Sequence, residues 1–441
     1  MTPEARRWAR GMILVVVLAA LARVDGREAP APDRGTWLRQ AIAEAAAGSV
    51  IDVPPGRHHG PFVVDRRLHL RGPREAVLEG DGTGHVIAVR AADVVIDGVT
   101  VRGSGMNLSQ DHAAIHITTP RTTIRNVRVL ESLHGIYIRQ AADVVVEGNV
   151  ITGRETTREM VDPDTLRPTP GEGELCEVAL SQDRRGNGIH AWNSTGLVIV
   201  RNVIRRTRDG IYFSFVDRAD VQENDIAQTR YGLHYMYSDD NRFTDNSFKD
   251  NAAGAALMFS KGIVLAGNAF EANRSHRAYG MLWQSVDDSE ARGNRFVGNT
   301  VGLFIEGGHG NRVLDNRVAG NHVGIRISAS SDGGTFAGNA FVGNVHTVET
   351  SGDHRSNVWA LDGRGNYWDG AMRLDLDGDG VGDLPHHELD LFGGLRRPFP
   401  AVALLSGSPA ERLLRFVHAR LRLPGLMGVT DPAPLVEVPR P

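Results

Sequence analysis

Histidine and methionine side chains recur at matching places in neighbouring segments of the chain. His190 and His234 each lie two residues after a glycine, Met236 lies two residues after His234, and Met258 follows 22 residues after Met236. Imidazole nitrogen and thioether sulfur are ligands that suit Cu(I). A transient copper site is therefore one predicted use of His190, His234, Met236 and Met258.

An acidic motif near the C-terminus has the spacing of a calcium loop. Aspartates at every second place, followed by a glycine and a fourth aspartate, match the first nine positions of such a loop. These aspartates are Asp375, Asp377, Asp379 and Asp383. The twelfth position holds His386 instead of the usual bidentate Glu. The spacing predicts a Ca²⁺ site, and a tight acidic turn without metal is the alternative.

A repeat places the histidines and methionines relative to one another. Asparagine recurs in short polar–Asn–x–apolar phrases, mostly 22 residues apart. The series is Asn202, Asn224, Asn246, Asn268, Asn294, Asn316 and Asn339. A glycine followed by alternating apolar residues runs in phase with it, as in DGIYF at Gly210. A period in the twenties indicates a solenoid, in which each unit buries its apolar face only against its neighbours.

The pattern inside each unit selects the kind of solenoid. Apolar residues alternate over three to five positions, which is typical of strands, and the repeat shows no 3.6-residue period. The consensus of a leucine-rich repeat is missing. We therefore predict an all-β fold, a right-handed single-stranded parallel β-helix with coils of about 22 residues. The Asn column then lies at one turn and bonds the backbone of the next coil, which is a structural role.

The same register predicts which side chains face outward. Residues two and four places after each glycine point away from the core, and many of them are aromatic, His or Met. A row of exposed apolar side chains marks a contact surface. We predict docking of another protein here, and metal contact or covering by a loop remain alternatives. The docking residues predicted on this face are Tyr137, Trp192, Tyr212 and Phe304.

Acidic residues also stack at one turn of the predicted coils. Asp217 lies seven places after its glycine, and the pairs Asp239–Asp240 and Asp287–Asp288 lie seven and eight places after theirs. Polysaccharide hydrolases need two carboxylates at about 5–10 Å. However, Asp is an ordinary turn residue, and no basic partner recurs beside these pairs. We expect a structural role and predict no catalytic residue.

The N-terminal part reads as an export signal followed by a cap. Residues 1–29 combine Arg6, Arg7 and Arg10 with an apolar stretch too short to span a bilayer, which predicts a signal peptide and a periplasmic location. An uncleaved membrane anchor is the alternative. Residues 30–48 form a spacer and a short amphipathic helix with Thr36 as its N-cap. The β-helix is expected over 49–370, with an insertion at about 154–186.

The C-terminal part is expected to contact a partner. Residues 371–407 hold the acidic loop and a connector, and 408–441 hold an amphipathic helix and an apolar, Pro-rich tail. Such a helix seals a solenoid end, lies on a membrane or docks on a partner. The tail is expected to be extended and to insert into a partner. The predicted docking residues of the helix are Leu413, Leu414, Val417 and Leu421.

Composition narrows the possible classes of protein. The chain has 441 residues and a formal net charge of −4, which argues against nucleic-acid binding through charge. Its one cysteine, Cys176, excludes a disulfide framework and zinc sites made of Cys pairs.

Several segments together resemble one family. They are LHYMYSDDN (233–241), AALMFSKGIVLAGN (255–268), GNYWDG (365–370), DLDGDGVGDLP (375–385) and the closing helix with PGLMGVTDPAP (424–434). With the signal peptide and the 22-residue coils, they look like the NosD family of nitrous oxide reductase maturation proteins.

The resemblance implies a non-enzymatic role in the periplasm. Family members work with an ABC transporter made of the ATPase NosF and the membrane subunit NosY. They receive copper from the lipoprotein NosL and help to load it into nitrous oxide reductase, NosZ. The family's copper fits His234, Met236 and Met258 by chemistry, and the closing helix would engage the membrane subunit. A polysaccharide-binding, lyase or hydrolase β-helix remains the competing class, because the fold alone does not decide function.

Overall fold

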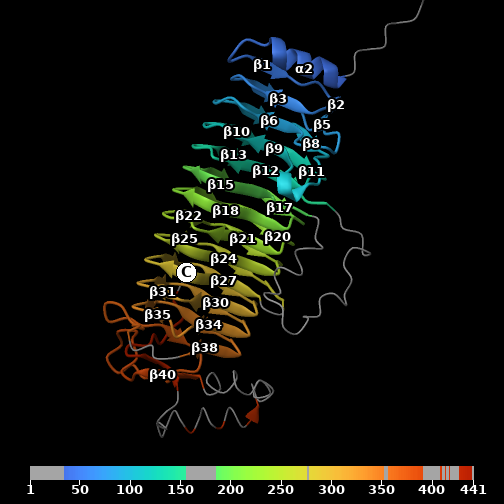
Figure 1. Ribbon diagram of the computed structural model, residues 1–441. Helices are drawn as coiled ribbons and strands as arrows, with labels where there is room; N and C mark the ends of the chain where they lie inside the picture. Colours follow the sequence, from blue (N-terminus) through green and yellow to red (C-terminus); the bar gives the residue numbers. More distant parts are fainter. Residues whose placement is uncertain are drawn as a thin grey trace, which may run out of the picture.

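The computed structural model describes residues 34–154, 185–275, 278–351, 356–390 and 427–439, together with residues 408, 409, 413 and 417. Three parallel sheets, here named A, B and C, run along the molecule, and each coil contributes one short strand to each of them. Figure 1 shows the coils stacked in sequence order from the N-terminal helix to β40 (His386–Asp390). The prediction of a parallel β-helix is confirmed.

The strands follow one another in the fixed order A, B, C along the chain. Sheet A consists of β1 (Val50–Asp52), β4 (His69–Arg71), β7 (Val95–Asp97), β10 (Thr123–Arg125), β13 (Val145–Glu147), β16 (Val198–Val200), β19 (Asp220–Gln222), β22 (Arg242–Thr244), β25 (Val264–Ala266), β28 (Glu290–Arg292), β32 (Arg312–Leu314) and β36 (Thr335–Ala337). Sheet B consists of β2 (Gly56–His59), β5 (Ala76–Glu79), β8 (Thr100–Arg102), β11 (Arg128–Leu130), β14 (Val150–Thr152), β17 (Val203–Arg205), β20 (Asp225–Ala227), β23 (Ser247–Lys249), β26 (Ala269–Glu271), β29 (Arg295–Val297), β33 (Arg317–Ala319), β37 (Ala340–Val342) and β39 (Tyr367–Trp368).

Sheet C has the longest strands and presents the widest face. It consists of β3 (Phe62–Val64), β6 (Ile87–Val89), β9 (Ala113–Ile117), β12 (His134–Arg139), β15 (Ile189–Thr195), β18 (Asp209–Asp217), β21 (Tyr231–Met236), β24 (Ala253–Lys261), β27 (Tyr279–Asp287), β30 (Val301–Glu306), β34 (Val323–Ile327) and β38 (His346–Thr350). A short 3₁₀ turn, η1 (Leu108–Gln110), precedes β9, and β31 (Gly308–His309) pairs with β35 (Ser331–Asp332) at a turn.

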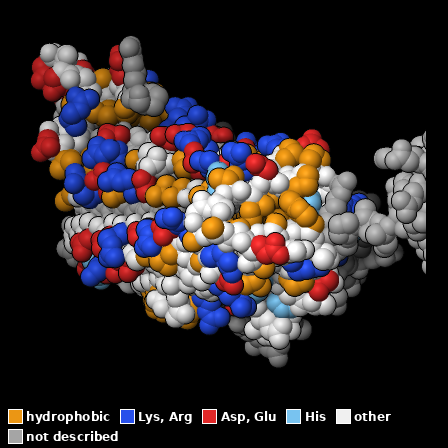
Figure 2. Space-filling model, turned by 90° about the horizontal axis from the view of Figure 1, so that it is seen from above, with side chains coloured by type: hydrophobic (Ala, Val, Ile, Leu, Met, Phe, Trp, Pro, Cys, Tyr) orange, Lys and Arg blue, Asp and Glu red, His pale blue; other side chains and the backbone are white. Residues whose placement is uncertain are grey.

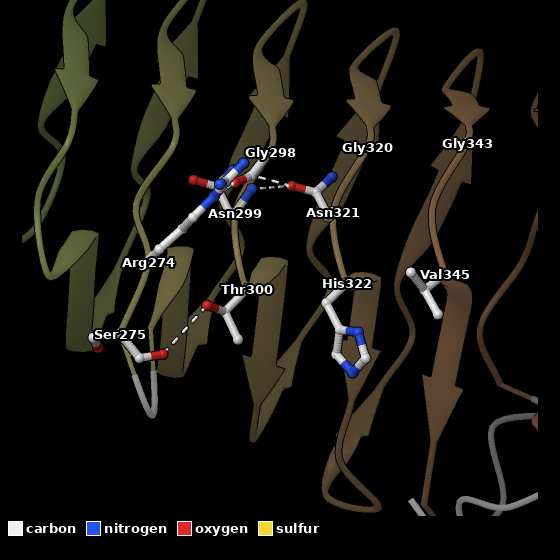
Figure 3. Close-up of a pocket in the computed structure, with 10 residues that line it drawn as sticks. All are labelled: Arg274, Ser275, Gly298, Asn299, Thr300, Gly320, Asn321, His322, Gly343 and Val345. Atoms are coloured by element: carbon white, nitrogen blue, oxygen red, sulfur yellow. Dashed lines mark hydrogen bonds between the residues drawn. The ribbon is translucent and has the colours of Figure 1, made fainter. Parts of the chain in front are cut away.

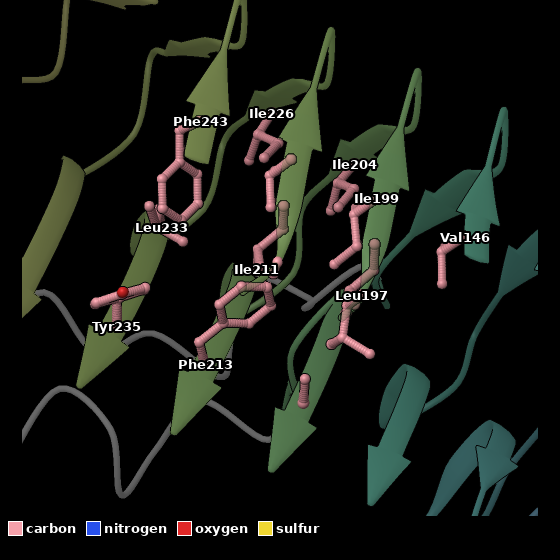
Figure 4. Close-up of a cluster of buried hydrophobic side chains, with 14 of the residues drawn as sticks. Val146, Leu197, Ile199, Ile204, Ile211, Phe213, Ile226, Leu233, Tyr235 and Phe243 are labelled. Carbon is pink, nitrogen blue, oxygen red and sulfur yellow. The ribbon is translucent and has the colours of Figure 1, made fainter. Parts of the chain in front are cut away.

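Apolar side chains from all three sheets meet along the axis of the solenoid. Most strands bury alternate residues, and the parallel register places equivalent positions of successive coils above one another. Figure 4 shows this for Ile211, Leu233, Phe213 and Tyr235, which come from neighbouring coils and point inward. Because each coil covers the core of the next, the two ends of the stack need caps.

The predicted Asn column is confirmed as a ladder inside the turn between sheets A and B. Each asparagine accepts, at its side-chain oxygen, a hydrogen bond from the backbone N–H of the asparagine one coil earlier, at 2.8–3.1 Å. The column extends beyond the predicted series to Asn149 and Asn366. These buried side chains satisfy backbone donors that water cannot reach.

A second asparagine ladder, which the sequence analysis missed, closes the turn between sheets B and C. Its asparagines follow those of the first ladder by five residues and accept backbone N–H groups at 2.8–3.1 Å in the same way. The members are Asn251, Asn273, Asn299, Asn321 and Asn344. Their regular spacing was visible in the sequence.

The N-terminal end is covered by α2 (Arg34–Glu44), whose Leu38 and Ile42 are buried against the first coils. The helix begins at Arg34 and ends at Glu44, so Thr36 lies within it rather than at its N-cap. Residues 1–29, predicted as a signal peptide, and nearly all of the predicted insertion at 154–186 lie outside the described residues.

The C-terminal tail closes the other end, which corrects one prediction. β41 (Met427–Asp431) pairs antiparallel with β40, and the buried Asp431 accepts hydrogen bonds from the backbone N–H of Asn366 at 2.7 Å and the indole N–H of Trp368 at 2.8 Å. Leu435 is buried with Tyr367. The predicted extended tail that inserts into a partner is therefore wrong for 427–435, because these residues pack against their own solenoid.

Little of the predicted C-terminal helix is described. Pro409, Leu413 and Val417 are helical, and the Leu413 side chain is 62% exposed. Leu414 and Leu421 lie outside the described residues. Among the helices described, none combines the length and the apolar character that crossing a bilayer requires.

Charged side chains of both signs share the outer surface. On the face shown in Figure 2, Lys and Arg lie beside Asp and Glu, with hydrophobic side chains between them. Pairs such as Arg121–Asp93 at 2.7 Å and Arg125–Asp97 at 2.8 Å join neighbouring coils. Exposed pairs of this kind each contribute about 0–1 kcal/mol, so the core and the ladders carry the stability.

Candidate metal-binding face

The outer face of sheet C carries the predicted column of aromatic and ligand side chains. The residues two places after each glycine are aligned from coil to coil by parallel pairing. They are Tyr137, His190, Tyr212, His234, Ala256, Leu282, Phe304 and Arg326. The predicted register is therefore correct.

The rings in this column pack against one another in tilted and edge-to-face pairs, which corrects the expectation of an open contact face. Ring centroids are separated by 4.5 Å for Tyr137–His190, 4.5 Å for His190–Tyr212 and 5.1 Å for Tyr212–His234. Tyr137 is only 4% exposed, so it is not available as a docking residue. His190, Tyr212 and His234 are half-buried because each ring is covered by its neighbours.

The column continues into the early coils, where the sequence analysis missed it. His116 lies between His85 and Tyr137, with centroid distances of 4.1 and 5.2 Å. His134 meets His190 edge-on at 5.0 Å. The looser spacing of the early coils concealed their register with the later ones.

Several of these imidazoles are neutral and structural. Nδ1 of His85 accepts the backbone N–H of Ala113 at 3.1 Å, and Nδ1 of His134 accepts that of Asn187 at 3.0 Å. A neutral ring that accepts at Nδ1 carries its proton on Nε2, so neither nitrogen offers a free lone pair. Burial lowers the pKa of His134 to about 4 and that of His190 to about 3. These rings stay uncharged at neutral pH.

His190 does not join the other predicted copper ligands. The ring of Tyr212 lies between His190 and His234, with both imidazoles against it. Nδ1 of His190 is 3.3 Å from the side-chain amide nitrogen of Asn187. The structure therefore separates His190 from the other predicted copper ligands, because the coil that carries Tyr212 lies between it and His234.

His234 is oriented differently from the structural histidines. Its Nδ1 lies 2.9 Å from Oδ2 of Asp209, which is buried and also accepts two hydrogen bonds from Arg230, at 2.8 and 2.6 Å. Burial acts to raise the pKa of Asp209, but the hydrogen bonds from His234 and Arg230 outweigh it and hold that pKa below its usual range. The Asp209 carboxylate is therefore ionised, and Nδ1 of His234 carries the donated proton. In the neutral ring with this tautomer the lone pair is on Nε2, and a guanidinium nitrogen of Arg230 also lies 3.3 Å from Nδ1.

Two thioethers lie beside this imidazole. Met236 follows His234 on the same face of β21, and it is the parallel partner of Met258 in β24 of the next coil. Neighbouring strands lie about 4.8 Å apart, so the two sulfur atoms can approach one ion. The hydroxyl of Tyr212 is 4.0 Å from Sδ of Met236. His234, Met236 and Met258 therefore lie on one face of two neighbouring coils, as the register predicted.

The remaining predicted docking residues lie on the same face, each two coils away from the nearest of the two methionines. Trp192 is half-buried, with the Arg139 guanidinium 5.4 Å from its ring centroid. Phe304 is also half-buried and packs, like Met258, against the cluster of Tyr231, Ala253, Ala256 and Leu282. Both residues form the apolar surroundings of the face.

The stacked aspartates hold turns together. Oδ1 of Asp217 accepts the backbone N–H of Asp239 at 2.8 Å, and Oδ1 of Asp239 accepts that of Lys261 at 2.9 Å. Asp287 bonds the N–H of His309 in the same manner at 2.9 Å. This geometry agrees with the structural role expected from the sequence.

Comparison with known proteins decides the family. The chain is 35% identical to the "Probable ABC transporter binding protein NosD" of Pseudomonas aeruginosa, over an alignment of length 452 that covers 97% of this chain and 96% of the relative. It is 34% identical to the protein of the same name from Stutzerimonas stutzeri, over 88% of this chain and 86% of that one. The chain belongs to the NosD family. The family model "Periplasmic copper-binding protein (NosD)" matches residues 173–372, a span that contains His234, Met236 and Met258.

Solved structures share only the fold with this NosD-family chain. The Dettilon tailspike protein has a TM-score of 0.50 and 14% identity, over 74% of this chain and 66% of that one. The mannuronan C-5 epimerase AlgE4 A-module of Azotobacter vinelandii has a TM-score of 0.43 and 13% identity, over 74% of this chain and 88% of that one.

The acidic loop of this NosD-family chain brings three of its four aspartates together. Oxygen atoms of Asp375, Asp377 and Asp379 lie within 4.8 Å of one another. Asp375 is held by the backbone N–H groups of Gly378 and Gly380, at 2.7 and 3.0 Å. Asp383 is outside this group and accepts the N–H of Leu376 at 2.7 Å. Three converging carboxylates fit a hard cation such as Ca²⁺.

An open groove crosses the turns between sheets B and C in the later coils (Figure 3). Arg274, Thr300 and His322 border it, and a Cβ atom added at Gly320 or Gly343 would meet nothing within 4 Å. Nε of Arg274 donates to the carbonyl of Gly298 at 2.7 Å. The groove contains a single imidazole and no thioether among its lining residues, so it lacks the ligand set found at His234.

Proposed function

We propose that this protein binds Cu(I) in the periplasm and serves the maturation of nitrous oxide reductase. In this role it works with an ABC transporter, composed of a NosY-type membrane subunit and a NosF-type ATPase. Copper passes to it from a NosL-type chaperone lipoprotein and from it to the NosZ apo-enzyme. The relatives' description as transporter binding proteins and the family's description as copper-binding support this role. We propose no catalytic activity for this protein.

The main support for this proposal is the hydrogen bond between His234 and Asp209, on the face that also presents Met236 and Met258. Metal-binding histidines commonly donate their other ring N–H to a carboxylate, which fixes the tautomer and makes the free nitrogen more basic. Asp209 occupies that position, and Arg230 fixes Asp209 in turn. Met236 and Met258 add two neutral sulfur ligands, which favour Cu(I) over harder ions.

Cu(I) titration of the mature protein under reducing conditions tests this ligand set. The His234→Ala/Met236→Ala/Met258→Ala variant is expected to bind about 100-fold more weakly than the wild type, because all three ligands are lost. Asp209→Asn is expected to weaken binding by about 10-fold while keeping all three ligands, because it removes the carboxylate that orients His234.

His190→Ala is the matched control, since it removes an imidazole from the same column at a place that Tyr212 separates from the site. Its Cu(I) affinity is expected to equal that of the wild type. Equal affinity of the triple variant and the wild type would show that the copper ligands lie elsewhere.

We also propose that the acidic loop binds Ca²⁺ through Asp375, Asp377 and Asp379. Millimolar Ca²⁺ is then expected to raise the unfolding temperature by about 2–4 °C, because ligand binding stabilises the folded state. An Asp377→Asn/Asp379→Asn variant would lose this response, whereas Asp362→Asn, at an exposed aspartate outside the loop, would keep it. The shift is measured by differential scanning fluorimetry, and an equal shift in both variants would contradict the site.

A further inference from the structure

Three aromatic rings stand in a row on the outer surface beside the candidate copper ligands. Phe215, Tyr237 and Phe259 come from three successive coils, and their side chains are 51%, 47% and 45% exposed. The ring centroids are 5.3 and 5.2 Å apart, with interplanar angles of 12° and 14°. They form a regular exposed stack, here named the aromatic ladder.

The backbone at these positions favours other residues. Phe215, Tyr237 and Phe259 have φ values of 55°, 50° and 52°, in the left-handed region where bulky side chains are uncommon. The equivalent positions of neighbouring coils hold Asn193 and Ser285 in the same conformation. The turn therefore does not need an aromatic residue. An unfavourable residue type in a strained position points to a use other than folding.

The ladder lies directly beside the thioethers. Tyr237 follows Met236 and Phe259 follows Met258 in the chain, and these methionines are parallel partners. Cu(I) moves between proteins by exchange of ligands, so the ligands of a second protein must come within bonding distance of the accepting sulfur atoms. A protein that brings Cu(I) to Met236 and Met258 would therefore rest on the exposed rings.

We propose that the aromatic ladder is the docking surface for the copper-donor protein, which would present its Cu(I) on an apolar surface. This inference rests on the proposed function, since it names the partner that meets the same site. Aromatic side chains are enriched in the cores of protein interfaces, where they exclude water. The ladder spans three coils, or about 10 Å, which suits the small contact of a transient encounter.

Binding of the donor lipoprotein to the apo-protein tests the docking surface separately from copper binding. In the Phe215→Asn/Tyr237→Asn/Phe259→Asn variant, each ring is replaced by a residue that the same turn already accepts at Asn193. Interferometry is expected to show about 10-fold weaker donor binding or more for this variant, because the apolar contact is lost. Ser285→Asn, at the same register in the next coil, is the control and should bind the donor like the wild type.

A second measurement keeps the two proposals distinguishable. When Cu(I) is supplied from a small-molecule chelator, the ring variant should bind it with the same affinity as the wild type, since all three ligands remain. Equal donor affinity of the ring variant and the wild type would overturn the docking proposal whatever the copper titration gives. Loss of a wild-type dimer in the ring variant, seen by sedimentation, would also overturn it, because the ladder would then be a self-association surface.

Discussion

Lowering the pH from 6.5 to 5 is expected to destabilise the folded protein by roughly 3–6 kcal/mol. The cause is the histidine column on sheet C. Burial, assisted by nearby cationic groups, lowers the pKa of His116 and His134 to about 4 and that of His190 to about 3. In the unfolded chain these rings titrate near 6.5.

Proton binding by the unfolded chain determines the direction of this pH effect on stability. Below pH 6.5 the unfolded chain takes up protons that the folded protein excludes, so each step towards acid favours unfolding. The stability that depends on these uncharged rings is fully present above pH 6.5 and is lost as the pH falls towards 4. Paired carboxylates such as Asp209, whose pKa is lowered, lose their contribution only at still lower pH.

Denaturant unfolding at several pH values between 7.5 and 4.5 measures this effect. His134→Asn is expected to reduce the slope between pH 6 and 5 by about one proton, because it removes one of the buried titrating rings. His309→Gln is the control: His309 is exposed and paired with Asp332, and that hydrogen bond raises its pKa. A stability that is flat or rises towards pH 4.5 would contradict the role of the column.

Asp431→Ala is expected to destabilise the C-terminal coils by about 3–5 kcal/mol. The Asp431 side chain is fully buried and accepts hydrogen bonds from Asn366, from Trp368 and, at 3.0 Å, from the backbone N–H of Ala433. Its removal leaves these donors without an acceptor in a place that water cannot reach. Hydrogen exchange should then accelerate in β39, β40 and β41 and change little in the early coils.

Two variants sharpen this experiment. Asp431→Asn keeps an acceptor oxygen and should lower the free energy of unfolding less than Asp431→Ala does. The asparagine loses mainly the negative charge that strengthens the hydrogen bonds. Thr430→Ala removes an exposed neighbour whose hydroxyl contacts His387 at 2.9 Å, and it should leave the exchange in β39 unchanged. Unchanged protection of β39 in Asp431→Ala would show that the tail does not hold the last coil.

The solenoid could be predicted from the sequence because the same physical requirement recurs in each coil. An asparagine at a fixed place satisfies the same backbone donor from Asn149 to Asn366, so the spacing alone indicates the fold and its register. The outward positions of His234, Met236 and Met258 followed from that register. These predictions needed only local periodicity.

The missed features depend on contacts that periodicity does not encode. The partner of His234 is Asp209, which lies in the preceding coil and has no counterpart in the repeat. The closing role of Asp431 requires pairing across 65 residues of sequence with Asn366. Phe215 is exposed because it occupies a turn with a left-handed backbone conformation. The alternation of apolar residues in the sequence does not indicate that conformation.

The first asparagine ladder also has a direction. Each side-chain amide nitrogen donates to the oxygen of the asparagine in the following coil, from Asn149 through to Asn339, and that of Asn366 donates to Asp431 at 3.2 Å. The amide dipoles are therefore aligned head to tail along the solenoid, with their positive ends towards the C-terminus. A carboxylate at that end complements the row, as an anion complements a helix N-terminus. The stack is thus electrically polar along its axis, and a negative charge is favoured at its C-terminal end and disfavoured at its start.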